Sequence, residues 1–178
     1  MFGDRKRGKG KLLFLLVVIF LFISWLSFSV LADSCNSNKI ALLGDSITVG
    51  WGPQFIQSCG NQPINYAVSG KWTPWMLTKL KSEILNKGYT HLIVLGGTND
   101  ISGGKSAPDV IANLEQIYFL ARNNNIKVIA GTIPPYNKQN SVEKNNVVKE
   151  INVWIRTQKE IGNIGGVVDF YQLLVSQE

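Results

Sequence analysis

From residue 39 onward, short apolar runs alternate with longer stretches in which apolar residues recur at helical spacing. The apolar runs predict five buried strands, at residues 40–43, 63–68, 91–97 and 126–135 and from Gly165. The stretches between them predict four helices, at residues 46–58, 72–88, 107–125 and from about 147 to 162. In the second of these helices, Thr73 is expected to be the cap, Pro74 suits the first turn, and Gly88 is expected to end it.

Continuous apolar strands separated by amphipathic helices indicate a parallel sheet covered on both faces. Right-handed crossovers then predict a three-layer α/β/α sandwich of the flavodoxin-like type. Its five strands are expected in the order 2-1-3-4-5.

Residues 1–32 do not follow this pattern. Five of the 18 Lys and Arg residues precede Leu12–Ala32, a run without a charge. As a helix this run would rise about 31 Å, enough to cross a bilayer. It predicts either a signal peptide, cleaved after the small residues at 30–32, or an N-terminal membrane anchor, which its length favours. Both alternatives remain open, and both place residues 33–178 outside the cytoplasm as an exported domain, secreted or membrane-anchored.

The composition excludes some partners. The N-terminal segment carries most of the net charge of +6, and no basic patch with interleaved aromatic residues follows it, so no nucleic acid is expected. No cluster of metal-ligating residues is seen in the sequence, so we expect neither a metal nor another cofactor.

The two cysteines are expected to pair. Cys35 precedes the first strand, and the helix at 46–58 runs back to the same end of the sheet, where it delivers Cys59. An exported domain favours a disulfide over two free thiols. Closing a loop of this size stabilises a fold by about 3 kcal/mol.

Small and hydrogen-bonding residues follow the first three strands, where the sites of such sheets gather. Ser46, at a strand-to-helix turn, is a candidate nucleophile. Its own N–H, the N–H of Gly70 and the side chain of Asn99 are candidate donors to an oxyanion, each worth a few kcal/mol to a tetrahedral intermediate. Turn glycines and a helix-capping Asn-Asp pair would be the purely structural alternative.

Three short blocks, "GDS", "NYAVSG" and "GGTND", follow the strands in this order. They resemble the first three blocks of the SGNH (GDSL-like) hydrolases, and "TIPP" after the fourth strand is also similar. The resemblance covers about residues 39–174 and implies a serine esterase or lipase acting on small-molecule, glycan or lipid esters. It assigns Ser46 as the nucleophile and Ser46, Gly70 and Asn99 as the oxyanion hole. The remaining matching positions are supporting ones, namely Asp45, Gly97 and Asp100.

The catalytic base is missing. The family carries a D-x-x-H block near its C-terminus, and no such block follows Asp169, which is expected only to end the fifth strand. His91, the one histidine, begins the third strand and so lies about 17 Å from the oxyanion donors. We expect little activity from residues 1–178. The favoured explanation is that the parent protein continues past Glu178, and the other is that the domain is catalytically disabled.

Two other functions are compatible with a fold of this type. The same fold could hold a carbohydrate or acyl ligand without turnover, as a non-catalytic binding module. A flavodoxin-like nucleotide or flavin binder is disfavoured, because Asp45 stands where a phosphate loop would be needed. Trp51, Trp72 and Trp75 flank the site loops and could line a pocket or pack in the core.

Overall fold

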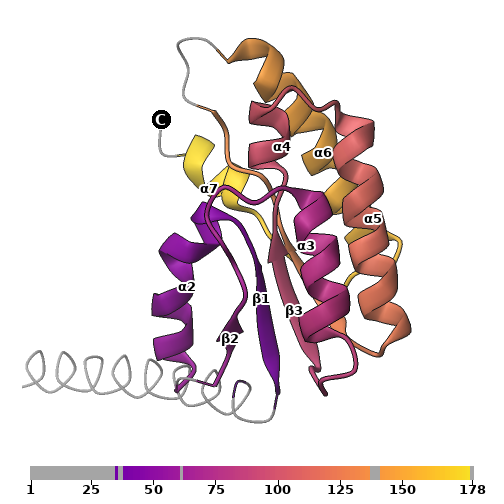
Figure 1. Cartoon of the computed structure of the whole chain (residues 1–178). Helices are drawn as coiled ribbons and strands as arrows, with labels where there is room; N and C mark the ends of the chain where they lie inside the picture. The colour runs from indigo at the N-terminus through magenta and orange to yellow at the C-terminus, as the bar shows by residue number, and fades with distance from the viewer. Residues whose placement is uncertain (1–34, 36–37, 61, 137–140, 177–178) are drawn as a thin grey trace, which may run out of the picture.

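A five-stranded parallel sheet forms the centre of the molecule (Figure 1). The computed structural model of the chain describes residues 35, 38–60, 62–136 and 141–176. The strands are β1 (Ile40–Gly44), β2 (Ile64–Asn65), β3 (His91–Leu95), β4 (Lys127–Gly131) and β5 (Gly166–Val168). Their order, β2-β1-β3-β4-β5, is the predicted one.

Alternate strand residues point to opposite sides of the sheet, and helices cover both sides. Ala41 and Leu43 join the larger core cluster, whereas Ile40 and Leu42 join the smaller one. The larger cluster receives side chains from α3 (Thr73–Lys79), α5 (Ala107–Asn123) and α6 (Val142–Glu160). The smaller one receives Trp51, Phe55 and Ile56 from α2 (Ser46–Ser58). The three-layer α/β/α sandwich is thereby confirmed.

The second, third and fourth strands are shorter than predicted. The second strand was expected over 63–68, but only Ile64 and Asn65 form regular pairs with β1. The Asn65 side chain accepts a hydrogen bond from the Ala67 N–H at 2.9 Å, which turns the backbone away from regular strand geometry. Even so, the chain stays beside β1, because the N–H of Tyr66 and the N–H of Val68 donate to carbonyls of that strand.

The helices differ from the prediction in several places. The helix predicted from about residue 147 begins at Val142, and α7 (Phe170–Val175) was not predicted. Trp72, not Thr73, is the cap residue of α3. Thr73 is the first helical residue, and its N–H and hydroxyl donate to the side chain of Asp100 and not to the helix. The helix predicted to run on to residue 88 continues after α3 as the π-helical turn η1 (Leu80–Ile84). The sequence did not predict the single-turn helix α4 (Thr98–Ser102), because five residues are too few to show a helical period.

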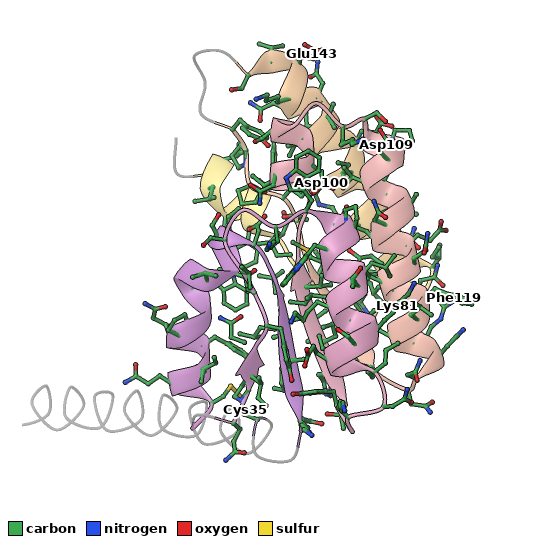
Figure 2. All side chains as sticks on the ribbon, in the orientation of Figure 1. Cys35, Lys81, Asp100, Asp109, Phe119 and Glu143 are labelled. Carbon is green, nitrogen blue, oxygen red and sulfur yellow. A yellow bond between two sulfur atoms is a disulfide. The ribbon has the colours of Figure 1, made fainter. Side chains whose placement is uncertain are left out.

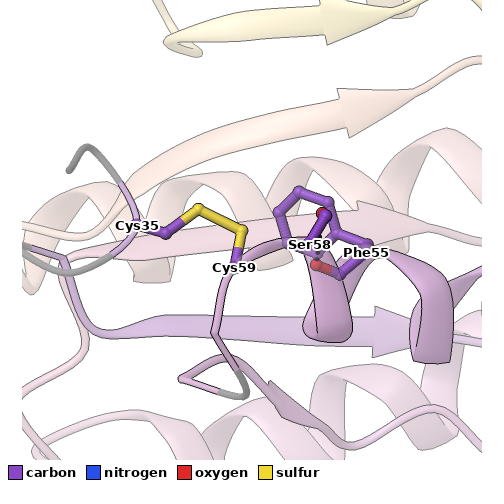
Figure 3. The surroundings of a disulfide bond; sticks show 4 residues. All are labelled: Cys35, Phe55, Ser58 and Cys59. Carbon is purple, nitrogen blue, oxygen red and sulfur yellow. Dashed lines mark hydrogen bonds between the residues drawn. A yellow bond between two sulfur atoms is a disulfide. The ribbon is translucent and has the colours of Figure 1, made fainter. Parts of the chain in front are cut away.

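Cys35 and Cys59 form a disulfide at the end of the sheet where the strands begin (Figure 3). Both residues are buried. The bond ties the chain ahead of β1 to the last turn of α2, next to Phe55 and Ser58. Figure 2 places Cys35 at one end of the molecule and Asp100 toward the other.

Among residues 35, 38–60, 62–136 and 141–176, no helix is long and apolar enough to cross a membrane. The apolar run at residues 12–32, predicted to be a signal peptide or an anchor, lies outside the described residues.

Candidate active site

Ser46 is the first residue of α2, and only Asp45 separates it from the buried strand β1. Asp45 caps this helix, since its Oδ1 accepts a hydrogen bond from the Ile47 N–H at 2.9 Å. Gly44 allows the tight turn, because a Cβ there would lie 2.1 Å from Thr48 Oγ1 and 2.8 Å from the Leu95 carbonyl. The turn leaves Ser46 exposed at the carboxyl edge of the sheet, beside the fully buried Asp45.

Asn99, in α4, links this turn to the loop after β2. Its Nδ2 donates to Asp45 Oδ2 at 3.3 Å and to the Lys71 carbonyl at 3.0 Å. Three loops that are 25 or more residues apart in the chain therefore meet at one side chain. The sequence placed Ser46, Gly70 and Asn99 on one edge of the sheet, and the structure brings the loops that carry them together.

Gly70 lies in the middle loop, one residue before Lys71. Its φ is +74°, a left-handed conformation that glycine adopts without strain, and a Cβ there would meet nothing within 4 Å. Among the described residues, no group accepts a hydrogen bond from the N–H of Gly70 or from the N–H of Ser46. Both backbone donors are thus available to a ligand.

Asp100, next to Asn99, is buried and binds the start of α3 to α4. Its buried carboxylate accepts hydrogen bonds from the Thr73 N–H, at 3.0 Å to Oδ2, and from the Thr73 hydroxyl, at 2.6 Å to Oδ1. Gly97, with φ of +117°, begins α4 where a Cβ would lie 2.7 Å from Ile133 Cδ1. These two residues set the position from which Asn99 projects.

The buried carboxylate of Asp45 has an unusual environment. Burial raises its pKa, the negative charge of Asp100 raises the pKa further, and the hydrogen bond from the Ile47 N–H lowers it. The net effect is a pKa above the usual value for aspartate. The protonation of Asp45 is therefore coupled to the charge of Asp100.

Tyr136, which follows the "TIPP" segment, is a site residue that the sequence analysis missed. Its hydroxyl donates to the Thr98 carbonyl and hydrogen-bonds with Ser102 Oγ at 2.9 Å. Its N–H donates to Asn145 Oδ1 at 2.8 Å, so α6 anchors it. Burial raises the pKa of Tyr136, and the acidic groups Asp45 and Asp100 contribute to this increase. The one available signal was an aromatic residue after the fourth strand, on the same edge as the other loops.

His91 lies at the opposite end of β3 from the site. It pairs with Ile40 at the start of β1, and its Nδ1 is 3.0 Å from Thr90 Oγ1. Burial lowers the pKa of His91, and the positive charge of Lys127 lowers it further. Four strand steps of about 3.3 Å separate it from Leu95, so it is out of reach of Ser46. Among the described residues, no group hydrogen-bonds with Ser46 Oγ.

Asp169, which was expected to end the fifth strand, has a structural role. It follows β5 directly and caps α7 (Phe170–Val175), where it accepts from the Gln172 N–H. Arg156 donates to both carboxylate oxygens, at 2.8 and 3.0 Å, and this ion pair holds the pKa of Asp169 below its usual value. The Thr132 hydroxyl also donates to Asp169, at 2.9 Å. Its oxygens are therefore already occupied.

The three tryptophans near the site loops have different surroundings. Trp51 packs against Phe55 and Phe170, with ring centroids 6.0 and 5.9 Å apart. Trp75 lies under the ammonium groups of Lys71 and Lys79, each 5.4 Å from its ring centroid. Trp72 is 37% exposed and rests against Gly103, where a Cβ would lie 2.3 Å from its ring. Of the three, Trp72 is the one that presents an exposed ring beside the site loops.

The chain is thus a three-layer α/β/α sandwich with a serine at the turn after the first strand of a parallel sheet. The chain belongs to the GDSL-like lipase/acylhydrolase family, whose family model matches residues 42–178. A search of curated protein sequences finds no match.

Solved structures of similar proteins share this fold. A lipolytic protein of the G-D-S-L family from Veillonella parvula is 26% identical, with a TM-score of 0.69 over 78% of this chain and 80% of that one. A GDSL-like lipase from Bacteroides thetaiotaomicron is 21% identical, with a TM-score of 0.67 over 82% and 78% of the two chains. The esterase EstA from Pseudoalteromonas, inhibited by monoethylphosphonate, is 18% identical, with a TM-score of 0.63 over 79% and 81%.

Proposed function

We propose that this protein hydrolyses carboxylic esters through an acyl-enzyme on Ser46. The observation that carries the proposal is the double hydrogen bond of Asn99 Nδ2 to Asp45 Oδ2 and to the Lys71 carbonyl. It ties an amide donor to the residue that precedes Ser46 in the strand-to-helix turn, and acyl transfer uses a fixed donor near its serine nucleophile. The activities of the similar proteins, lipase and esterase, agree with this class of reaction.

In the first step, Ser46 Oγ attacks the ester carbonyl carbon and gives up its proton to a base. The carbonyl oxygen becomes an oxyanion that accepts from the N–H of Ser46, the N–H of Gly70 and Asn99 Nδ2. Both protons of that amide are engaged in the free protein, and the 3.3 Å bond to Asp45 is the longer one. A developing oxyanion would therefore take the proton that points to Asp45.

Collapse of the tetrahedral intermediate breaks the bond to the alcohol, which leaves with a proton. Water then attacks the acyl-enzyme, and the acid is released as the Ser46 proton returns. The base is the one component that the described residues lack, because His91 lies at the other end of β3. The proposal therefore predicts that an added base restores turnover.

Imidazole supplies this base in a direct test. We expect the 178-residue chain to hydrolyse p-nitrophenyl acetate slowly, and added imidazole to increase a rate that saturates with substrate. Ser46→Ala should leave only the rate of imidazole itself, while Ser82→Ala, an exposed serine at the other end of the molecule, should behave as the parent chain does. Imidazole-dependent rates that are equal in the parent chain and in Ser46→Ala would refute an acyl-enzyme on Ser46.

A non-catalytic binding module is the second candidate. It is favoured by the position of His91, the one histidine of the sequence, and by the occupied carboxylate of Asp169. A binding module would bind an ester or its acid with saturation and show no Ser46-dependent rate at any imidazole concentration. Calorimetric titration with acetate esters of short oligosaccharides separates this outcome from hydrolysis.

We further propose that the domain acts outside the cytoplasm, either secreted or anchored by residues 12–32. The apolar run and the disulfide between Cys35 and Cys59 support this location, because disulfides persist in oxidising compartments. The N-terminal residue of the protein isolated from its native host, read by mass spectrometry, decides between cleavage and anchoring.

A further inference from the structure

The end of the sheet opposite the site carries a group of basic side chains. Lys39, Lys87, Arg122 and Lys127 are all exposed there and are called the basic end below. Lys39 Nζ donates to the Lys87 carbonyl at 2.5 Å. Arg122 and Lys127 line one hollow of about 200 Å³, and the N–H of Lys127 donates to the Thr90 carbonyl beside His91. These contacts bring three stretches of the chain together into one surface, around residues 39, 87–90 and 122–127.

Few acidic groups lie near this surface. Among the described residues they are Glu83, Glu160 and Glu115, which lines a hollow together with Arg122. Glu83 already pairs with Lys79 at 3.6 Å, and Glu160 follows Lys159 in the last turn of α6. The opposite end of the molecule carries the carboxylates Asp100, Asp109 and Glu143 (Figure 2).

The disulfide places the start of the domain at this same end. Cys35 bonds to Cys59 beside the first residues of β1, and the apolar run Leu12–Ala32 stops three residues before Cys35. Three extended residues span at most about 11 Å. If residues 12–32 lie in a bilayer, the end of the domain that carries Cys35 must lie close to its surface.

We propose that the basic end docks onto the anionic phospholipid headgroups of the membrane that holds residues 12–32. Each lysine or arginine near an anionic bilayer strengthens such docking by about fivefold. Docking turns the carboxyl edge of the sheet, with Ser46, away from the bilayer, so that substrates arrive from the aqueous side. The proposal goes beyond ester hydrolysis and depends on anchoring by residues 12–32, not on the chemistry of Ser46.

The test uses the full chain in nanodiscs of phosphatidylglycerol or phosphatidylcholine, at low and high salt. Hydrogen–deuterium exchange is measured in the peptides that cover residues 85–91 and 122–127. We expect slower exchange in phosphatidylglycerol at low salt only. The double variant Lys87→Gln/Lys127→Gln, which should weaken docking about 25-fold, is expected to lose this protection.

The matched control is Lys105→Gln/Lys149→Gln, which removes the same charge from exposed positions outside the basic end. It should keep the protection of the parent chain. Equal exchange in the two lipids, equal loss of protection in both double variants, or a chain that does not associate with either nanodisc would each overturn the proposal. None of these outcomes depends on esterase activity, so they are distinguishable from failure of the proposed function.

Discussion

Asp45 combines three tasks in one side chain. It caps α2, it accepts a hydrogen bond from Asn99 Nδ2, and it is fully buried next to Ser46. The first task fixes the turn that exposes Ser46, and the second fixes the amide donor of the proposed oxyanion hole. The burial of Asp45 disfavours its charged form, because the protein interior stabilises a charge less than water does.

Asp45→Asn should therefore change how stability depends on pH. Burial raises the pKa of Asp45 above 3.8 in the folded protein, so the folded state binds the proton more tightly than the unfolded state. The resulting stabilisation is complete below pH 3.8 and is lost as the pH rises through the raised pKa. We expect the free energy of unfolding of Asp45→Asn, relative to the parent chain, to increase from pH 4 to pH 7 in urea titrations.

Asp109→Asn is the matched control for this prediction. Asp109 is exposed, and its hydrogen bonds from the Ser106 hydroxyl and N–H lower its pKa. Its contribution to stability is present above pH 3.8 and is lost as the pH falls through the lowered pKa. Relative to the parent chain, Asp109→Asn should therefore lose most stability at neutral pH. The same pH trend in both variants would contradict the assigned environment of Asp45.

At the scale of elements, the site depends on how α3 and α4 are fastened to each other. The Thr73 N–H and hydroxyl, at the start of α3, both donate to Asp100 in α4. Asn99, the neighbour of Asp100, then reaches the loop between β2 and α3. Two short helices thus position the amide donor, and neither would be stable by itself at this length.

Asp100→Ala should separate these helices. The change leaves two buried donors of Thr73 without an acceptor, and we expect a loss of about 2 to 4 kcal/mol in the free energy of unfolding. The imidazole-dependent ester hydrolysis should fall as well, because Asn99 loses its fixed position. Urea unfolding measures the first effect, and Glu115→Ala, on the exposed side of α5, serves as a surface control. A stable Asp100→Ala protein with unchanged hydrolysis would refute this role.

The elements also show where sequence patterns stop being informative. The stripe of α5 that includes Val110, Leu114 and Ile117 is buried as its period predicted. The second strand was predicted too long, because its apolar run continues past the point where the Asn65 side chain diverts the backbone. The helix α4 was missed because its position is set by Gly97 and by the contact of Asp100 with Thr73, not by a repeat of apolar residues.

On the scale of the whole molecule, the disulfide and the site occupy opposite ends of the sheet. The Cys35→Ser/Cys59→Ser variant opens a loop of 24 residues, and we expect it to lower the free energy of unfolding by about 3 kcal/mol. Urea unfolding with and without dithiothreitol checks this prediction. The reductant should destabilise the parent chain by a similar amount and leave the double variant unchanged, and hydrolysis below the unfolding transition should not change.

The sequence by itself determined the sheet, its strand order and the edge on which Ser46, Gly70 and Asn99 meet. It could do so because alternating apolar runs and helical periods are local patterns, and the carboxyl ends of parallel strands share one edge. Only the tertiary structure decided which groups bond across that edge: Asn99 with Asp45 and Lys71, and Tyr136 with the Thr98 carbonyl. Such contacts join loops through side-chain packing between distant residues, and no local spacing encodes them.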